Sequence, residues 1–515
     1  MGQDEFSPST VTSSPLLLQS PWALAPFAAA AAATASSPTP FLGYGGSPWA
    51  AAASGDRGVE LINLLRQCAF DVDAGSLERA DACLARIAGL LSSSSASASS
   101  ASPTGGGGGG GGGQATRFHR LATIFTDALA RRLLRRPLPG AYEALLAPAA
   151  SSDPLLVAAA RRHFFDLCPF LKLAFLTSNQ AILEQMEGER VVHIVDLAGP
   201  AADPAQWLAL LRALRARPEG PPHLRITAVH DDPDALHRTS ALLSKEADAH
   251  DMSFQFHPVL SRLDALDFDS LRVKTGEALA VSSVLQLHSL LPPAAAAADS
   301  NSTAALALRH AHHLSPGSFG ELLERELSLG HGHGRGHPFS PSPDAHSLAP
   351  TPPHSPRRIE SFLSGLLALA PKIVVVTEQE ANHNGAAFCE RFSEALYYYA
   401  AMFDCLETTA PRSAAEWGRV ERLLLGEQIR NIVACEGAER RERHERLQRW
   451  AQRLRDAGFG HVPLSFDALL EARKLLQTFG RDGYKVDDWN GCFFFCWHER
   501  PLYSVSAWRC NRLSS

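Results

Sequence analysis

Charged residues are absent from the first part of the chain, which has none between residues 6 and 55 and consists mainly of Ala, Ser, Pro and Gly. Such a composition cannot offset the conformational entropy that ordering a chain costs. Arg57 is the first basic residue, and Pro21 and Pro26 interrupt the apolar stretch, so we expect neither a secretory signal nor a membrane span. We expect residues 1–57 to form a disordered tail.

Paired cysteine motifs and an excess of positive charge are also missing. The nine cysteines form an odd set without a CxxC pair, which is typical of a reducing compartment and argues against disulfides or structural zinc. The formal net charge is -6, so no positive field over the whole molecule would draw it to nucleic acid. We therefore expect a protein of the cytosol or nucleus.

Leucine-rich helical patterns follow the tail. Leu61, Leu64 and Leu65 recur at helical spacing, a second pattern follows Gly75, and residues 118–134 resume it. The first three leucines form an LxxLL arrangement, which can lie in a groove of a partner protein. The same leucines can instead face the core of their own domain, and we favour this second interpretation.

Two low-complexity segments divide the chain. A serine run with nine glycines predicts a disordered insertion at 92–115, and Ala, His and Pro tracts predict a second at 292–356. We expect a helical cap at 58–150 and an α/β core at 151–512, each carrying one insertion.

Short β-rich runs alternate with helical patterns beyond residue 190, which is typical of βαβ units in a mostly parallel sheet. We expect strands at 191–197, 224–229, 254–258, 278–284, 372–377, 491–498 and 503–509. A short polar connection joins the last two, so they should pair antiparallel at a sheet edge. The predicted fold is α/β with a methyltransferase-like (Rossmann-type) layout.

The turn after the first strand is where such a fold would bind a cofactor. The strand ends at Asp196, and the turn offers a single glycine, Gly199, followed by Pro200, which lacks an N–H donor. A helix capped by Asp203 follows. We favour a packed turn that has lost its ligand, and we expect no cofactor. The alternative is a retained pocket for adenosylmethionine or another small ligand above Asp196.

Other polar residues near this turn have structural explanations. His193 lies inside an apolar strand, where a hydrogen-bonded core histidine is commoner than a ligand or a base. A polar cluster follows the fifth strand: Glu378, Glu380, Asn382 and His383. With Asp196 these residues could hold a metal, but they fit no metal-ligand spacing and are typical of a loop and helix cap. We expect no catalytic or metal site.

Seven arginines in residues 439–455 raise direct DNA binding as a second alternative. The pattern predicts one helix in which glutamates pair with arginines four residues further on, at Glu439–Arg443, Glu442–Arg446 and Glu445–Arg449. Leu447, Trp450 and Leu454 would form its buried stripe. We favour a solvated, self-paired helix; a steep loss of affinity with salt would instead mark DNA binding.

The chain resembles the plant GRAS regulators over residues 58–512. Residues 192–196 resemble the family's VHIID motif, with one conservative change, valine for isoleucine, at position 195. Leucine-rich regions flank this motif at 58–134 and 235–271, as they do in the family. His193 and Asp196 are the motif's polar positions.

Further motifs lie nearer the end of the chain. Residues 500–509 resemble the family's terminal SAW motif, whereas residues 391–394 match its PFYRE region least literally. The RVER element and two tryptophan spacings supply the remaining motif positions: Arg419, Glu421, Trp450, Gly458, Trp497 and Trp508. We expect all of these positions to be structural.

The resemblance implies a helical cap on a methyltransferase-like core and a non-enzymatic, nuclear transcriptional coregulator. Residues 217–227 and 271–288 are most similar to a Scarecrow-like type, which implies a role in gibberellin signalling and root development. The implied partners are DELLA-type and Scarecrow or Short-root type GRAS proteins and zinc-finger transcription factors, with DNA contacted indirectly. Homo- or hetero-dimers are implied, and a membrane is not.

Overall fold

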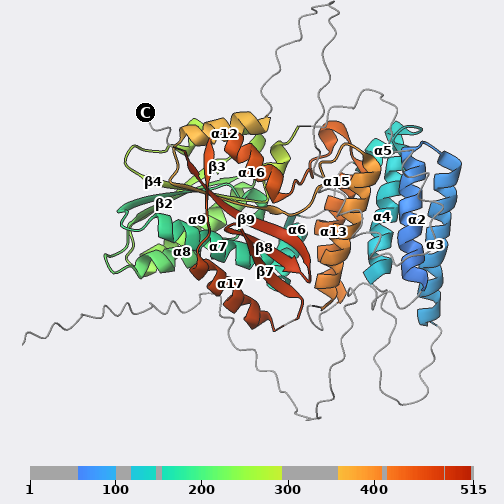
Figure 1. Ribbon diagram of the computed structural model, residues 1–515, viewed down its shortest axis with the longest axis horizontal. Helices are drawn as coiled ribbons and strands as arrows, with labels where there is room; N and C mark the ends of the chain where they lie inside the picture. The colour runs from blue at the N-terminus through green and yellow to red at the C-terminus, as the bar shows by residue number, and fades with distance from the viewer. Residues whose placement is uncertain are drawn as a thin grey trace, which may run out of the picture.

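The computed structural model describes residues 56–99, 117–146, 154–292, 358–408, 414–480 and 482–511 (Figure 1). The expected tail up to residue 55 and most of both expected insertions lie outside these residues. Helix α3 (Leu77–Ser99) includes residues 92–99, so this part of the first expected insertion is helical. No helix among the described residues has the length and apolar composition needed to cross a bilayer.

Four helices form the cap: α2 (Asp56–Asp73), α3, α4 (Arg117–Leu134) and α5 (Pro139–Leu146). Figure 1 shows α2, α3 and α4 side by side, with α13 (Phe388–Thr408) and α15 (Gly426–Ala434) between them and the sheet. The Phe125 and Phe392 rings meet edge to face with centroids 5.4 Å apart, which joins α4 to α13. The cap therefore shares one hydrophobic core with the rest of the molecule.

A nine-stranded sheet has the order β3-β2-β1-β4-β5-β9-β8-β7, with β6 paired to β9. Its first five members in this order pair in parallel, and β9, β8, β7 and β6 pair antiparallel. The strands are β1 (Val191–Asp196), β2 (His223–His230), β3 (Phe254–Leu260), β4 (Ala278–Val284), β5 (Ile373–Gln379), β6 (Phe459–Val462), β7 (Tyr484–Trp489), β8 (Cys492–Trp497) and β9 (Arg500–Cys510). This order confirms the methyltransferase-like layout.

The predicted strand pair at the end of the chain is confirmed as antiparallel, but its predicted place at the sheet edge is wrong. β9 lies between β5 and β8, and the edge is formed by β7. The strand β7 was missed because its sequence, Tyr484–Trp489, carries polar residues and lacks a clear apolar alternation. β6 was missed because it has only four residues.

Helices cover both faces of the sheet. α7 (Phe170–Gln185), α8 (Pro204–Arg215), α9 (Pro233–Ala249) and α17 (Phe466–Phe479) pack on the face that Val192 and Ile194 of β1 enter. α12 (Arg358–Ala368) and α16 (Leu447–Asp456) pack on the other face, which Val195 enters. Successive side chains of a strand point to opposite faces, which explains why valine and isoleucine occupy both faces of this strand.

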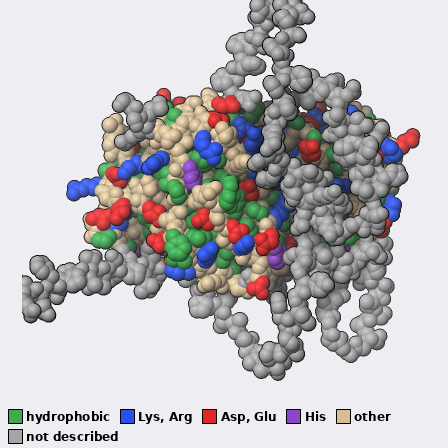
Figure 2. All heavy atoms as spheres, in the orientation of Figure 1, with side chains coloured by type: hydrophobic (Ala, Val, Ile, Leu, Met, Phe, Trp, Pro, Cys, Tyr) green, Lys and Arg blue, Asp and Glu red, His purple; other side chains and the backbone are tan. Residues whose placement is uncertain are grey.

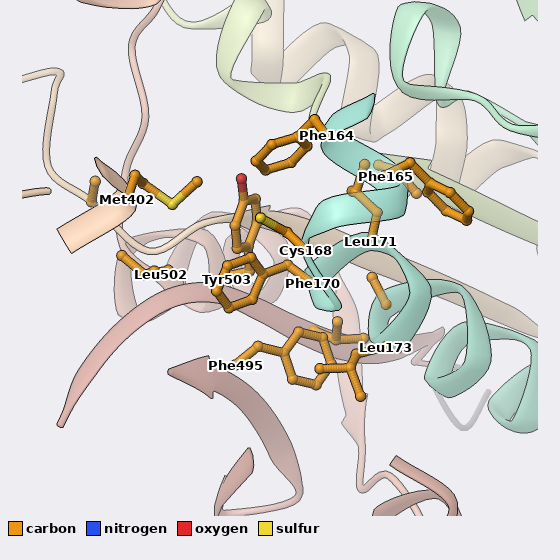
Figure 3. Packing of buried hydrophobic residues seen from close by; sticks show 14 of the residues in the cluster. Phe164, Phe165, Cys168, Phe170, Leu171, Leu173, Met402, Phe495, Leu502 and Tyr503 are labelled. Carbon is orange, nitrogen blue, oxygen red and sulfur yellow. The ribbon is translucent and has the colours of Figure 1, made fainter. Parts of the chain in front are cut away.

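The junction of α6 (Pro154–Leu167) and α7 anchors the antiparallel strands (Figure 3). The Phe170 and Tyr503 rings lie 5.1 Å apart between centroids, and Cys168 packs beside them. All nine cysteines are free thiols, as the sequence predicts.

The predicted helix at 439–455 is wrong in its first half. A short 3-10 turn ends at Glu439, residues 440–446 have no regular structure, and α16 begins at Leu447. The predicted pairs are replaced by distant ones, since Glu445 binds Arg453 through two hydrogen bonds of 2.8 and 2.9 Å. The stripe of Leu447, Trp450 and Leu454 is buried as expected.

Candidate functional site at the carboxyl edge of the sheet

Asp196 ends β1 at the position where a nucleotide-binding fold would present its ligand turn. The side chain is buried, and Asp196 Oδ1 accepts a hydrogen bond of 2.9 Å from the Ala198 backbone N–H. Its Oδ2 accepts one of 2.7 Å from the Trp207 indole N–H. Burial raises the pKa of this carboxyl, although both hydrogen bonds oppose the rise. Asp196 therefore fastens α8 to β1.

Side chains of the protein itself line the turn after Asp196. Gly199 has a φ of +47°, and a Cβ added there would lie 3.3 Å from the Gln286 side-chain oxygen. Gln206 is buried beneath, and its amide nitrogen lies 3.4 Å from Ser282 Oγ. Asp203 caps α8 as predicted, accepting from the Ala205 N–H. The turn has the packed arrangement that the single glycine indicates.

His193 lies in the core, with a polar side chain close to each ring nitrogen. Nε2 is 2.8 Å from Thr227 Oγ1, and Nδ1 is 2.9 Å from a Glu277 carboxylate oxygen. That carboxylate also accepts from Arg225 at 3.0 Å. Burial, followed by the neighbouring Arg225 charge, lowers the pKa of His193 to about 4, against the pull of Glu277. The ring is neutral at physiological pH and joins β1, β2 and the residues before β4.

The polar cluster after β5 holds neighbouring segments in place. Glu378 Oε1 accepts from the backbone N–H groups of Gln286 and Leu287, at 3.1 and 2.8 Å. Glu380 accepts from the Leu447 N–H at 2.9 Å, which satisfies a donor at the start of α16. Burial raises the pKa of Glu380 to about 6. These acids act as helix caps. Asp196 makes its hydrogen bonds with other residues, Ala198 and Trp207.

A group of buried histidines and acids lies beyond the ends of β4 and β5. His444 Nδ1 lies 2.9 Å from His383 Nδ1, and His444 Nε2 lies 3.1 Å from a Glu442 oxygen. His288 Nε2 lies 3.4 Å from the same oxygen. Burial lowers the pKa of His288, but the carboxylates of Glu378 and Glu442 outweigh it and raise the value to about 10. Burial lowers the pKa of His383 well below its ordinary range.

The sequence predicts only part of this group. His383 was recognised as polar and close to the carboxyl edge, but His288, Glu442 and His444 were not connected to it. Glu442 and His444 lie in the segment that was predicted to be a solvated helix. His288 comes from far away in the chain, and no spacing rule joins the three, so only the folded arrangement reveals them.

The leucines proposed for partner binding lie inside the cap. Leu61 and Leu65 are each 1% exposed and Leu64 is 9% exposed, and all three belong to the core shared with α4 and α13. The burial favours the interpretation in which they face their own domain. The outward face of α2 instead carries a shallow depression of about 450 Å³ lined by Val59, Glu60, Asn63, Leu64, Gln67 and Arg86.

The paired charged residues of the RVER element lie at the boundary of cap and core. Glu421 is buried, and both of its carboxylate oxygens lie 3.0 Å from Arg120 Nε of α4. Burial raises the pKa of Glu421, and the Arg120 charge opposes this. Arg419, in α14 (Ala414–Val420), lies 3.4 Å from His163 Nε2 of α6. Both side chains join separate helices.

The tryptophan and glycine positions are packed into the sheet and its helices. Trp497 donates to Asp404 at 2.8 Å, and Trp508 donates to Ser506 at 2.9 Å. Trp450 is buried between α16 and the sheet. Gly458 has a φ of +100°, and an added Cβ would lie 3.1 Å from Leu367 Cδ2. These side chains contact other parts of the fold.

Comparisons with known proteins agree with this arrangement. The model of the GRAS domain family matches residues 61–509. Scarecrow-like protein 3 of Arabidopsis thaliana is 46% identical over 89% of this chain and 90% of that protein. DELLA protein GAI1 of Vitis vinifera is 33% identical over 93% of this chain and 67% of its own length.

A solved structure gives the same answer for the fold. SCL7 of Oryza sativa matches with a TM-score of 0.58 and 29% identity, covering 81% of this chain and 99% of that one. A family model that spans the cap and the core, together with relatives similar over most of their length, leads to one conclusion. The chain belongs to the GRAS family, whose model matches it from helix α2 to strand β9.

Proposed function

We propose that the chain is a non-enzymatic transcriptional coregulator that acts in the nucleus by binding other GRAS proteins and DNA-bound transcription factors. The observation that carries this proposal is the turn after β1, where Asp196 is bound by Trp207 and Gln286 lies against Gly199. Side chains lie where a nucleotide-binding fold would hold its cofactor. The similarity to Scarecrow-like protein 3 and to DELLA proteins supports a role in gibberellin signalling and root development.

The outward face of the cap is the surface that we propose for pairing with other GRAS proteins. Val59 is 41% exposed on α2, and Glu60 forms an ion pair with Arg86 of α3. Because Leu61 and Leu65 are buried, a partner would contact the polar and apolar side chains around the depression. DELLA-type and Scarecrow or Short-root type proteins are the proposed partners there.

DNA contact through zinc-finger transcription factors fits the charge of the molecule. Lys and Arg side chains lie among Asp and Glu across the described part of the face in Figure 2. Several arginines of the 439–455 segment are engaged inside the protein, such as Arg440 with the His383 carbonyl and Arg443 with the Gly437 carbonyl. Promoter choice would then come from the partner.

Capture of the intact chain from plant nuclear extract, with and without nuclease, tests the proposal. DELLA, sister GRAS and zinc-finger proteins should remain bound after the DNA is digested, because the contacts are between proteins. Loss of these partners with the DNA would favour direct DNA binding. The salt dependence of any DNA affinity would then measure how many phosphates are contacted.

Calorimetric titration with adenosylmethionine tests the small-ligand alternative. Because the chain's own side chains lie along the turn after β1, we expect no heat of binding at about millimolar ligand. A dissociation constant of about 1 mM corresponds to a binding free energy of about -4 kcal/mol. Saturable heat that is lost in Asp196→Asn would establish a retained pocket.

A further inference from the structure

Three potential metal ligands converge beyond the carboxyl ends of β4 and β5. His288 lies in the short 3-10 helix after β4, and Glu442 and His444 lie in the irregular segment before α16. One ligand atom from each falls within 4.8 Å of the other two. Both imidazole Nε2 atoms approach the same Glu442 oxygen, at 3.4 and 3.1 Å.

These separations suit ligands around one cation. Tetrahedral zinc with nitrogen and oxygen ligands at about 2.0–2.1 Å places neighbouring ligand atoms about 3.3 Å apart. The His444 ring is fully buried, and neither its Nε2 nor the Glu442 oxygen has a hydrogen-bond partner of suitable geometry. A buried nitrogen that points at two other potential ligands without a hydrogen bond is an observation independent of the cluster itself.

The outer nitrogens of both histidines are already held. His288 Nδ1 lies 3.1 Å from Glu378 Oε2, and His444 Nδ1 lies 2.9 Å from His383 Nδ1. Metal-bound histidines commonly use their second nitrogen in this way, which fixes the ring so that Nε2 faces the ion. The cluster thus has both the inner and the outer contacts of a metal site.

The charges around the cluster also suit a cation. Glu378 and Glu442 supply two carboxylates, and both lie within ion-pair distance of His288. The nearby guanidinium groups of Arg440 and Arg443 are directed at backbone carbonyls. The Glu442 side chain is 23% exposed as a whole, while its oxygen that faces both histidines is buried.

We infer that His288, Glu442 and His444 bind a divalent transition-metal ion, with zinc the ion whose preferred ligands match best. The bound ion would pin residues 440–446 against the ends of β4 and β5. The role of the ion would be structural. Residues 440–446 lack regular structure, and the ion would cross-link them to a distant part of the chain. This inference is independent of the proposed coregulator function.

Metal analysis of the full chain, made without a histidine tag, tests the inference. The protein is loaded with zinc, passed through a column containing a weak chelator, and measured by mass spectrometry of the metal. Wild type should retain one equivalent more than Glu442→Gln or His444→Gln. His250→Gln, which changes a histidine at the end of α9, should retain as much as wild type. Equal zinc in all four proteins would overturn the inference.

Cobalt(II) provides a readout that needs no variant. Cobalt in a tetrahedral site of two imidazoles and a carboxylate gives visible absorption bands, whereas cobalt held loosely by surface histidines as an octahedral ion absorbs far less. Wild type loaded with one equivalent should show the tetrahedral bands, and a chelator should remove them and lower the Tm. Absence of these bands in folded wild type would overturn the inference, whatever the variants do.

Discussion

At the scale of single residues, the ionisation of His193 predicts a specific pH dependence. Its pKa is lowered to about 4 in the folded protein, while an unfolded histidine titrates near 6.5. The unfolded chain therefore binds a proton that the folded chain does not, so stability is present above about pH 6.5 and is lost as pH falls towards 4. Wild type should lose roughly 1–3 kcal/mol more than His193→Asn across this window. Urea unfolding at several pH values measures the difference.

The control for this prediction is His250→Asn. His250 is partly exposed and lies within ion-pair distance of Glu246 at the end of α9. The His250→Asn variant should show the same change in the free energy of unfolding with pH as wild type. Identical slopes for wild type and His193→Asn would show that the buried ring takes up its proton in the folded state.

The backbone conformation of Gly458 gives a second testable prediction. Its φ of +100° is a region that side chains disfavour, and Leu367 lies 3.1 Å from the position of an added Cβ. Gly458→Ala should lower the free energy of unfolding by about 1–3 kcal/mol. Gly89→Ala is the matched control, because this α3 glycine has nothing within 4 Å and should gain up to about 1 kcal/mol. Equal changes in the free energy of unfolding for Gly458→Ala and Gly89→Ala, measured with urea, would show that position 458 does not require glycine.

At the scale of elements, burial of the LxxLL leucines changes what their substitution should do. Leu65 is 1% exposed, so Leu65→Ala should destabilise the protein by about 2–5 kcal/mol through lost packing. Asn63→Ala, two residues away on the exposed face of α2, should change stability by about 0.5 kcal/mol or less. Thermal unfolding with far-ultraviolet circular dichroism distinguishes the two. Unchanged stability in Leu65→Ala would favour the interpretation in which this leucine binds a partner.

Elements with strong local patterns were predictable from the sequence. The parallel strands and the Asp203 cap of α8 were placed within a few residues, because short β-rich runs and cap chemistry are local signals. β6 was too short to show a pattern, and β7 alternates weakly. The segment 440–446 was mispredicted because its Glu and Arg spacing is helical, yet its side chains find distant partners.

The candidate site shows the same difference between features set by local sequence and features set by long-range packing. The packed turn at Asp196 was predictable, because the glycine count and Pro200 lie in one short stretch. The hydrogen bond from Trp207 to Asp196 was not, because it depends on how α8 packs against β1. The group around His288 depends on three separate segments and emerges only when the chain folds.

At the scale of the whole molecule, the cap and core behave as one body. The Glu421–Arg120 pair and the Phe125–Phe392 contact cross their boundary, and a single hydrophobic cluster runs through both. The free surface of the cap is therefore the outward side of α2 and α3. A GRAS partner that docks there would leave the sheet and its edge strand β7 for other proteins.

The central claim is tested most directly by the affinity of the purified chain for a DELLA protein in the absence of DNA. Wild type should bind, and the double variant Val59→Arg, Asn63→Arg should bind at least about tenfold more weakly, since it alters the exposed face of α2 without touching the core. Leu242→Arg, an equally exposed change on α9, should bind like wild type. No binding without DNA, or the same affinity in all three proteins, would contradict the account.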